Sequence, residues 1–367
     1  PPGAGAQAAS DAPAIEFGQL LVGFPSAEAA QAGFAELKSR YGVAVSESAA
    51  FANLGLVVGL VQLDSNEAAA QLRQRLVQAH PDWIVDFNAQ LAPLAGPRLY
   101  ALAQIGGAAG APPGPGARMG LLDSGVDAIP ALAQARIAVQ GFVESAGADA
   151  NAHGTALAAL LVGKDAASGF QGVAPGTELV VGAIVRRDGK REDTTVTLLL
   201  AGLDWLLAQD VRVINLSLGG PPNALMAAAI AAVTRRGVVI VAAAGNGGPG
   251  APPAYPAAYP GVIAVTANDA AGNVFERANR GDYVLLSAPG VDVWVPDHAG
   301  GRYVSGTSFA AAAVTGAVSL LLRSKPEATP DQVGRHLCAT ARNLGDPGRD
   351  PVFGCGLLQV QATAASR

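Results

Sequence analysis

From residue 118 onward, short apolar segments alternate with longer segments of helical pattern, and this alternation constrains the fold more than any other feature. The expected strands are Arg118–Leu122, Leu179–Ile184, Val211–Leu216, Val238–Ala243, Val262–Thr266 and Val284–Ser287. The expected helices are Ala156–Val162, Thr194–Gln209, Ala224–Arg236 and Thr307–Arg323. Apolar strands separated by helices indicate an α/β domain with a mainly parallel sheet sandwiched by helices. Ligands of such sheets bind outside the carboxyl ends of the strands.

The first part of the chain has a different pattern, β-α-β-β-α-β over residues 15–91. Its expected strands and helices are Leu20–Phe24, Ala27–Tyr41, Val43–Ala52, Leu56–Leu63, Asn66–His80 and Trp83–Phe87. This order predicts a small α+β domain of ferredoxin-like topology. Residues 1–13 are rich in Pro, Gly and Ala and are predicted to be disordered. The predicted organisation is therefore 1–13 disordered, 14–94 a small domain, and 95–367 a large α/β domain.

Composition excludes several classes of function. Half of the 367 residues are apolar, only 14% are charged, and the net charge of −5 offers no basic face for nucleic acid. No uninterrupted apolar run reaches the ~18 residues of a membrane span. The nearest, Thr315–Leu322, continues an expected helix and is predicted to be core. Metal-binding spacings such as His-Glu-x-x-His and paired Cys-x-x-Cys are absent.

Three short motifs place chemistry at three points of the large domain. Asp123 ends an apolar strand in Gly-Leu-Leu-Asp-Ser-Gly, His153 opens His-Gly-Thr before a helix, and Ser308 lies in Ser-Gly-Thr-Ser-Phe-Ala before another. A serine hydroxyl is a weak nucleophile, so it needs a base to take its proton and a carboxylate to orient that base. The chain order Asp, His, Ser is one of the known arrangements of this machinery.

These motifs and the segments around them resemble the subtilase family of serine peptidases. Val213–Gly220 resembles the family strand that lines the substrate cleft, and Val241–Asn246 resembles the segment whose asparagine binds the oxyanion. Tyr255–Val265 resembles the following segment, which carries a cis-proline in the family. The resemblance covers about residues 95–365. It implies a serine endopeptidase that forms an acyl-enzyme and needs no organic cofactor.

The resemblance assigns a role to each site residue. Ser308 is expected to attack the peptide carbonyl, His153 to transfer the proton, and Asp123 to orient the imidazole. Asn246 and the Ser308 N–H are expected to donate to the oxyanion. The other histidines, His80, His298 and His336, lack the His-Gly-Thr context and are predicted to be structural or surface residues.

The expected substrates are proteins or peptides bound in extended form. Ser217, Leu218 and Gly219 are expected to pair with the substrate as an added strand. Residues 242–244, with Ala243 at the centre, and Ala254 are expected to line an apolar pocket for the residue before the cut. No acidic cluster marks these segments, which argues against selectivity for basic residues.

Residues 14–94 resemble the propeptide of the family, which assists folding and inhibits the enzyme. The resemblance places self-cleavage at the Leu94–Ala95 bond, after Leu91-Ala92-Pro93. An unrelated ferredoxin-like module is the alternative for this domain. A cleaved propeptide that stays bound, giving a latent enzyme, is a further alternative.

Several expectations concern conditions outside the active site. Cys338 and Cys355 are the only cysteines, and they either form a disulfide or remain two buried thiols. The chain opens without a signal peptide, so it is either cytoplasmic or begins after a removed signal; the resemblance favours a secreted or periplasmic monomer. The loop 164–171 has the length of a family calcium loop, but Ala166 and Leu132 stand where oxygen ligands are expected. Calcium is therefore disfavoured at this loop. Asp165 or Asp188 is the alternative ligand for a calcium ion at another place.

Two other functions compete with a peptidase. A pseudoprotease that only binds peptides normally lacks a triad residue or the oxyanion donor, and all four are present here. An esterase normally carries a Gly-x-Ser-x-Gly elbow, which is missing around Ser308.

Overall fold

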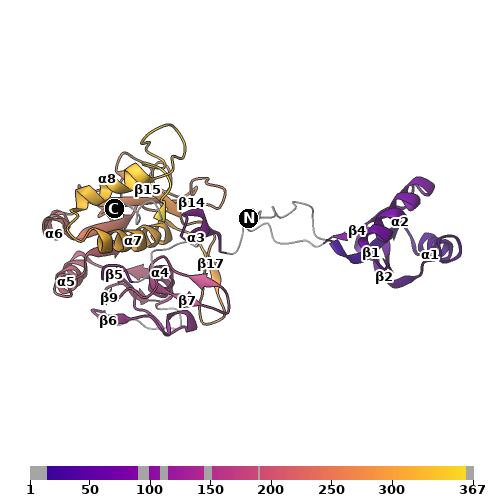
Figure 1. Cartoon of the computed structure of the whole chain (residues 1–367), viewed down its shortest axis with the longest axis horizontal. Helices are drawn as coiled ribbons and strands as arrows, with labels where there is room; N and C mark the ends of the chain where they lie inside the picture. Colours follow the sequence, from indigo (N-terminus) through magenta and orange to yellow (C-terminus); the bar gives the residue numbers. More distant parts are fainter. Residues whose placement is uncertain (1–14, 90–98, 108–114, 144–150, 189–190, 361–367) are drawn as a thin grey trace, which may run out of the picture. The chain divides into compact units, whose positions relative to one another are not determined.

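The computed structural model describes residues 15–89, 99–107, 115–143, 151–188 and 191–360. The chain divides into two compact units, Pro1–Leu94 and Ala95–Arg367, and each has its own hydrophobic core (Figure 1). The expectations of disorder over residues 1–13 and of cleavage at Leu94–Ala95 lie outside the described residues.

The first unit is a four-stranded antiparallel sheet with two helices. Its elements are β1 (Ile15–Phe24), α1 (Ala27–Tyr41), β2 (Val45–Phe51), β3 (Leu56–Gln62), α2 (Asn66–Ala79) and β4 (Ile84–Ala89). The sheet order β2-β3-β1-β4 is that of a ferredoxin-like domain. Both helices begin at a serine, Ser26 or Ser65, whose side chain accepts a backbone N–H of the first turn. Leu37 and Leu76 of these helices pack on Leu20 and Val22 of the sheet and form the core of the unit.

The second unit is built on a seven-stranded sheet. Its strands are β5 (Met119–Asp123), β6 (Ile137–Gly141), β9 (Leu179–Ala183), β12 (Val213–Leu216), β13 (Val239–Ala243), β14 (Val262–Asn268) and β15 (Val284–Pro289). The sheet order is β15-β14-β13-β12-β5-β9-β6, and all of its pairings are parallel. The prediction of a parallel α/β sheet is therefore confirmed.

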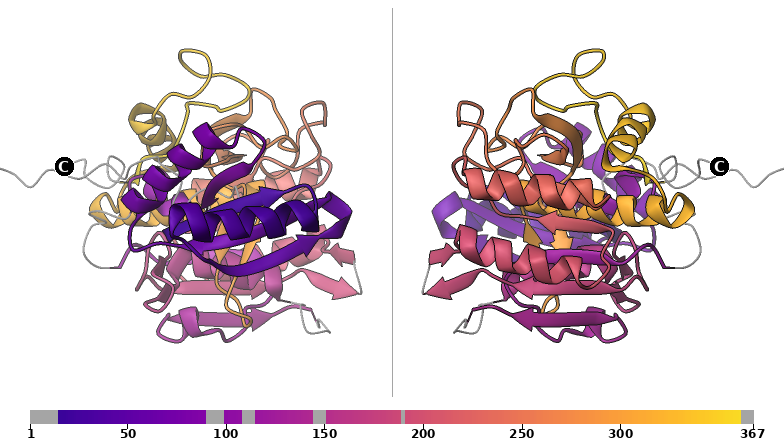
Figure 2. Two further views of the ribbon diagram at one scale, coloured as in Figure 1. Left: turned by 90° about the vertical axis from the view of Figure 1, so that its right-hand side faces the viewer. Right: turned by 90° about the vertical axis from the view of Figure 1, so that its left-hand side faces the viewer.

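Helices cover both faces of this sheet, because successive strand residues point to opposite sides. Leu121 and Val241 pack on one face with α4 (Ala152–Val162) and α7 (Thr307–Ser324). Leu122 and Ile240 pack on the other face with α5 (Val196–Leu207) and α6 (Ala224–Arg235). In the right-hand view of Figure 2, α5 and α6 lie side by side in front of the sheet.

Among the described residues, α7 is the one helix long and apolar enough to cross a membrane, but 89% of it is buried inside the protein. It contacts five strands of the sheet, β5 and β12–β15, and packs against α4. It is therefore the central core helix, as expected for Thr315–Leu322.

The structure corrects and extends the sequence analysis at short elements. Helix α4 begins at Ala152 rather than Ala156, so His153 lies within its first turn. The elements that the sequence analysis did not identify are α3 (Tyr100–Gln104), β6, β7 (Lys164–Asp165), β8 (Phe170–Gln171), β10 (Arg186–Asp188), β11 (Arg191–Asp193), β16 (Val293–Val295), β17 (Arg302–Val304) and α8 (Pro330–Thr340). Cys338 of α8 forms a disulfide with Cys355, at a Cα–Cα distance of 5.1 Å.

Candidate active site

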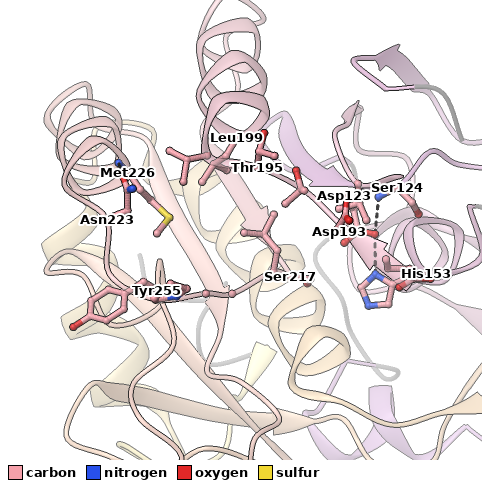
Figure 3. Close-up of a pocket in the computed structure, with 18 of the residues that line it drawn as sticks. Asp123, Ser124, His153, Asp193, Thr195, Leu199, Ser217, Asn223, Met226 and Tyr255 are labelled. Carbon is pink, nitrogen blue, oxygen red and sulfur yellow. Dashed lines mark hydrogen bonds and ion pairs between the residues drawn. The ribbon is translucent and has the colours of Figure 1, made fainter. Parts of the chain in front are cut away.

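Asp123 and His153 meet at the carboxyl end of the parallel sheet. Asp123 is the last residue of β5, and its side chain is buried. Its Oδ1 lies 2.7 Å from His153 Nδ1 and also accepts the Ser124 backbone N–H at 2.8 Å (Figure 3). The carboxylate therefore fixes the ring of His153 and leaves its other nitrogen, Nε2, facing away from Asp123.

The Asp-Ser-Gly and His-Gly-Thr motifs are complementary in shape. The Gly154 N–H donates to Ser124 Oγ at 3.0 Å, and the Asp127 N–H donates to Thr155 Oγ1 at 2.9 Å. A Cβ on Gly154 would lie 2.6 Å from the carbonyl oxygens of Ser124 and Gly125, so only glycine allows this approach. These contacts seat the first turn of α4 against the end of β5 and bring His153 to Asp123.

Opposing effects set the pKa of His153. Burial lowers it, whereas the negative charge of Asp123 and the hydrogen bond to its carboxylate raise it. Glu192 raises it further and Arg302 lowers it by charge. The net pKa lies above the ordinary value of 6.5, because Asp123 and Glu192 together outweigh the effects of burial and of Arg302.

Ser308 lies in the first turn of α7, with only 7% of its surface exposed. The next residue, Phe309, places its ring 5.6 Å from the ring of His153, measured between centroids. Ser217 Oγ donates to the Ser308 carbonyl at 3.3 Å and ties the cleft strand to the same turn. The free helix N–H groups at this end favour negative charge beside Ser308. No hydrogen bond joins Ser308 to His153 here, as is common in unliganded enzymes.

Asn246 lies beside the same turn and is held through its carbonyl oxygen. Oδ1 accepts the Thr307 N–H at 3.0 Å and the Thr307 hydroxyl at 2.9 Å. This leaves the Nδ2 donor directed away from Thr307. Gly245 precedes it with a φ of 111°, and a Cβ there would lie 2.6 Å from the Asn279 side chain. The backbone turn that presents Asn246 thus depends on glycine.

Two adjoining pockets share the segment 217–222 as a common wall. One, of about 600 Å³, is lined by Ser308, Asn246 and all five residues that the sequence assigned to substrate binding: Ser217, Leu218, Gly219, Ala243 and Ala254. The predicted lining is wrong at two positions. Ala242 in β13 and Ala244 directly after it are buried and do not line the pocket.

The other pocket, of about 510 Å³, contains Asp123 and His153 at one end. Figure 3 shows Ser217 in the middle, with Leu199 and Met226 on the side away from His153. The sequence analysis missed both of these apolar residues, since each lies on a helix whose apolar positions are also those of a core.

Two acidic residues also line the second pocket. Glu192 and Asp193 come from the β10–β11 hairpin, and Asp193 accepts the Arg186 Nε–H at 2.5 Å. The sequence analysis was right that the segments around Ser217 and Ala243 carry no acidic cluster. It did not foresee that a hairpin from elsewhere would bring carboxylates to the cleft, so its argument against basic substrates does not cover this pocket.

In the loop 164–171, where the sequence disfavours calcium, the side chain of Asp165 bonds to the loop itself. Asp165 accepts the Ala167 N–H at 3.1 Å and the Ser168 hydroxyl. Across the described residues, no three His, Cys, Asp or Glu side chains gather in a way that could hold a metal ion. Both carboxylate oxygens of Asp165 are therefore engaged within the loop.

The chain matches the model of the Peptidase_S8 "Subtilase family" over residues 114–356. It is 34% identical over 262 residues to Subtilisin DY of Bacillus licheniformis, covering 68% of this chain and 92% of that protein. Two solved structures are similar along most of their length. MycP1 with its N-terminal propeptide removed has a TM-score of 0.61 and 27% identity, covering 74% of this chain and 99% of that one. The self-cleaved protease domain of PatA has a TM-score of 0.57 and 28% identity, covering 68% and 95%.

Proposed function

The chain belongs to the subtilase family of serine endopeptidases, and from this premise we propose that Asp123, His153 and Ser308 are its catalytic triad. The observation that carries the proposal is the 2.7 Å contact of Asp123 Oδ1 with His153 Nδ1, beside a serine at the N-terminus of α7. The triad acts on protein and peptide substrates.

Each residue has one task in the reaction. Ser308 Oγ attacks the peptide carbonyl while His153 Nε2 takes its proton, and Asp123 stabilises the imidazolium that forms. His153 then gives the proton to the departing amine, and a water molecule hydrolyses the acyl-enzyme by the same route. Asn246 Nδ2 and the Ser308 N–H donate to the oxygen that becomes negative.

The pocket beside Ser308 favours an apolar residue before the cut. Ala243, Ala254 and Gly219 line it with small apolar groups, and a Cβ on Gly219 would lie 3.4 Å from Ala254 Cβ. Ser217–Gly219 offers backbone groups to an extended peptide, which adds as a strand. The cleft therefore selects an unfolded or extended segment rather than a folded surface.

The first unit, Pro1–Leu94, is the propeptide of the peptidase, and the enzyme is made as a self-processing zymogen. Support comes from the division of the chain between Leu94 and Ala95, and from the apolar sequence Leu91-Ala92-Pro93-Leu94 before it. It also comes from similarity to MycP1, which has an N-terminal propeptide, and to the self-cleaved PatA domain. The proposed enzyme is a secreted or periplasmic monomer, a setting in which the Cys338–Cys355 disulfide persists.

Intact mass over time, wild type beside Ser308→Ala, tests this function. Wild type is expected to lose a fragment ending near Leu94, and Ser308→Ala is expected to stay full length. The variant should also lose about 10⁶-fold in kcat, a magnitude known for subtilisin itself. Ser324→Ala is the matched control, because this serine lies at the far end of the same helix and only caps Leu321. If Ser308→Ala is cleaved at the wild-type rate, or wild type freed of residues 1–94 does not react with a fluorophosphonate, the proposed triad is wrong.

A further inference from the structure

Arg302 links the two segments that carry the catalytic base and nucleophile. It lies on β17, six residues before Ser308, and β17 pairs with β16 in a hairpin. Its Nη2 donates to the carbonyl oxygen of Ala152 at 3.1 Å, and Ala152 directly precedes His153. This hydrogen bond joins the hairpin that leads into Ser308 to the first turn of helix α4.

Arg302 and several other charged or titratable residues line a small pocket of about 190 Å³ beside the start of α4. Arg302 Nε lies 4.0 Å from Asp297 Oδ2, within the same hairpin. Across the pocket, Asp127 Oδ1 accepts the Asn151 Nδ2–H at 2.7 Å, and Asp127 Oδ2 lies 3.9 Å from His298 Nε2. The side chain of Arg302 is 46% exposed, so solvent weakens the ion pair with Asp297, and the bond to Ala152 is the specific contact.

We propose that Arg302 is a positioning residue, which fixes His153 relative to Ser308 by tying the hairpin that leads into Ser308 to the carbonyl that precedes His153. This inference rests on the proposed triad. Asp123 fixes the His153 ring to β5, and its carboxylate bonds to His153 and Ser124 rather than to α7 or the hairpin. Since His153 and Ser308 are not hydrogen-bonded to each other, their alignment depends on the contacts between their segments. A displacement of about 1 Å between reacting groups can cost 10²-fold in rate.

Arg302 also acts on His153 by charge. Asp123 from β5 and Glu192 from β11 raise the pKa of His153, and Arg302 from β17 opposes them. Removing the guanidinium charge therefore raises this pKa further. Lysine keeps the positive charge but replaces the planar guanidinium with a single ammonium group. Arg302→Lys should therefore preserve the effect on the pKa of His153, but only part of the alignment of His153 with Ser308.

Arg302→Ala and Arg302→Lys in the matured enzyme test the inference, with a chromogenic amide of Leu-Ala-Pro-Leu as substrate. For Arg302→Ala we expect kcat to fall by about 10- to 100-fold, with KM within about twofold. The acid limb of kcat/KM should move to higher pH. Arg302→Lys should restore the position of the acid limb and part of kcat. Arg136→Ala is the control, because Arg136 also donates an Nη2–H to a backbone carbonyl, that of Gly176, but does not line the cleft.

Three outcomes would overturn the inference. The first is a kcat within twofold of wild type with an unmoved acid limb in Arg302→Ala. The second is an equal loss in both Arg302 variants together with a lowered melting temperature, which indicates a role in folding alone. The third is an equal loss in Arg136→Ala. A wild type that does not hydrolyse the amide at all would instead refute the proposed triad, so the two failures are distinguishable.

Discussion

At the scale of single residues, two of the proposed catalytic groups, Asp123 and Asn246, are oriented by neighbours that have no part in the chemistry. Ser124 holds the carboxylate of Asp123 through its N–H, and Thr307 holds the amide of Asn246 through both its N–H and its hydroxyl. The residues proposed to react could be named from the sequence, because each stands in a short motif whose residue types the chemistry requires. The sequence could not predict Arg302 or Glu192, because a lone charged residue in a strand of three residues carries no signal of what it will face.

The raised pKa of His153 predicts the pH dependence of hydrolysis. The imidazole must be neutral to accept the Ser308 proton, so kcat/KM should be lost as pH falls through a pKa above the ordinary 6.5. Glu192→Gln removes a negative charge that raises this pKa, so its acid limb should lie at lower pH than that of wild type. The shift should shrink at high ionic strength, because Glu192 is exposed. An acid limb that moves to higher pH in Glu192→Gln, measured at low salt, would contradict this electrostatic account.

At the scale of elements, the site is an arrangement of two helix N-termini around the carboxyl ends of parallel strands. Helices α4 and α7 pack against each other beneath the site, and β5, β12 and β13 end beside it. Six strands of the sheet were predictable because each is a short continuous apolar run between helices, and four helices of the second unit were predictable because their apolar pattern extends over several turns. The hairpins β10–β11 and β16–β17 were not, because strands of three residues are too short to show a period. These hairpins carry Glu192 and Arg302, so the sequence analysis missed the elements that tune the site.

The close packing of the first turn of α4 against the end of β5 predicts that Gly154→Ala will strongly reduce activity and stability. The new Cβ would lie 2.6 Å from two backbone oxygens, of Ser124 and Gly125, which cannot move without displacing Asp123. We expect kcat to fall by at least about 10²-fold as His153 shifts, with a lowered melting temperature. Gly334→Ala is the matched control, because its Cβ would meet only Leu285 at 3.6 Å inside α8. That variant should keep full activity and gain up to about 1 kcal/mol in the free energy of unfolding. Equal activity of the two variants would show that the close approach at Gly154 is dispensable.

At the scale of the whole molecule, the first unit keeps an apolar sheet face that its own helices do not cover. Leu20 and Val22 of β1 face the core. Leu21 and Gly23 alternate with them and point to the opposite face of the sheet, together with their cross-strand partners on β3 and β4. Side chains on that face include Leu21, Phe51, Leu56, Val58, Leu60 and Ile84. Phe51 is 47% exposed and Ile84 57% exposed. The same face also carries Glu47 beside Leu60 and Asp86 beside Leu21, on its two outer strands. An exposed and largely apolar face of this kind is typical of a surface that binds another protein.

If residues 14–94 inhibit the mature enzyme, this face should contribute to the binding. The fragment 1–94 has its own core, so it can be produced alone and its folding checked by circular dichroism. Added to the mature enzyme, it should inhibit amide hydrolysis, and Phe51→Ser with Ile84→Ser should weaken inhibition at least about tenfold, since two large apolar side chains lose their burial. Val77→Ser is the control, because Val77 is similarly exposed but lies on α2. Equal inhibition by all three fragments would place the contact elsewhere on the unit. No inhibition by the folded wild-type fragment would favour the alternative of an unrelated ferredoxin-like module, and it would leave the triad and the Arg302 contact untouched.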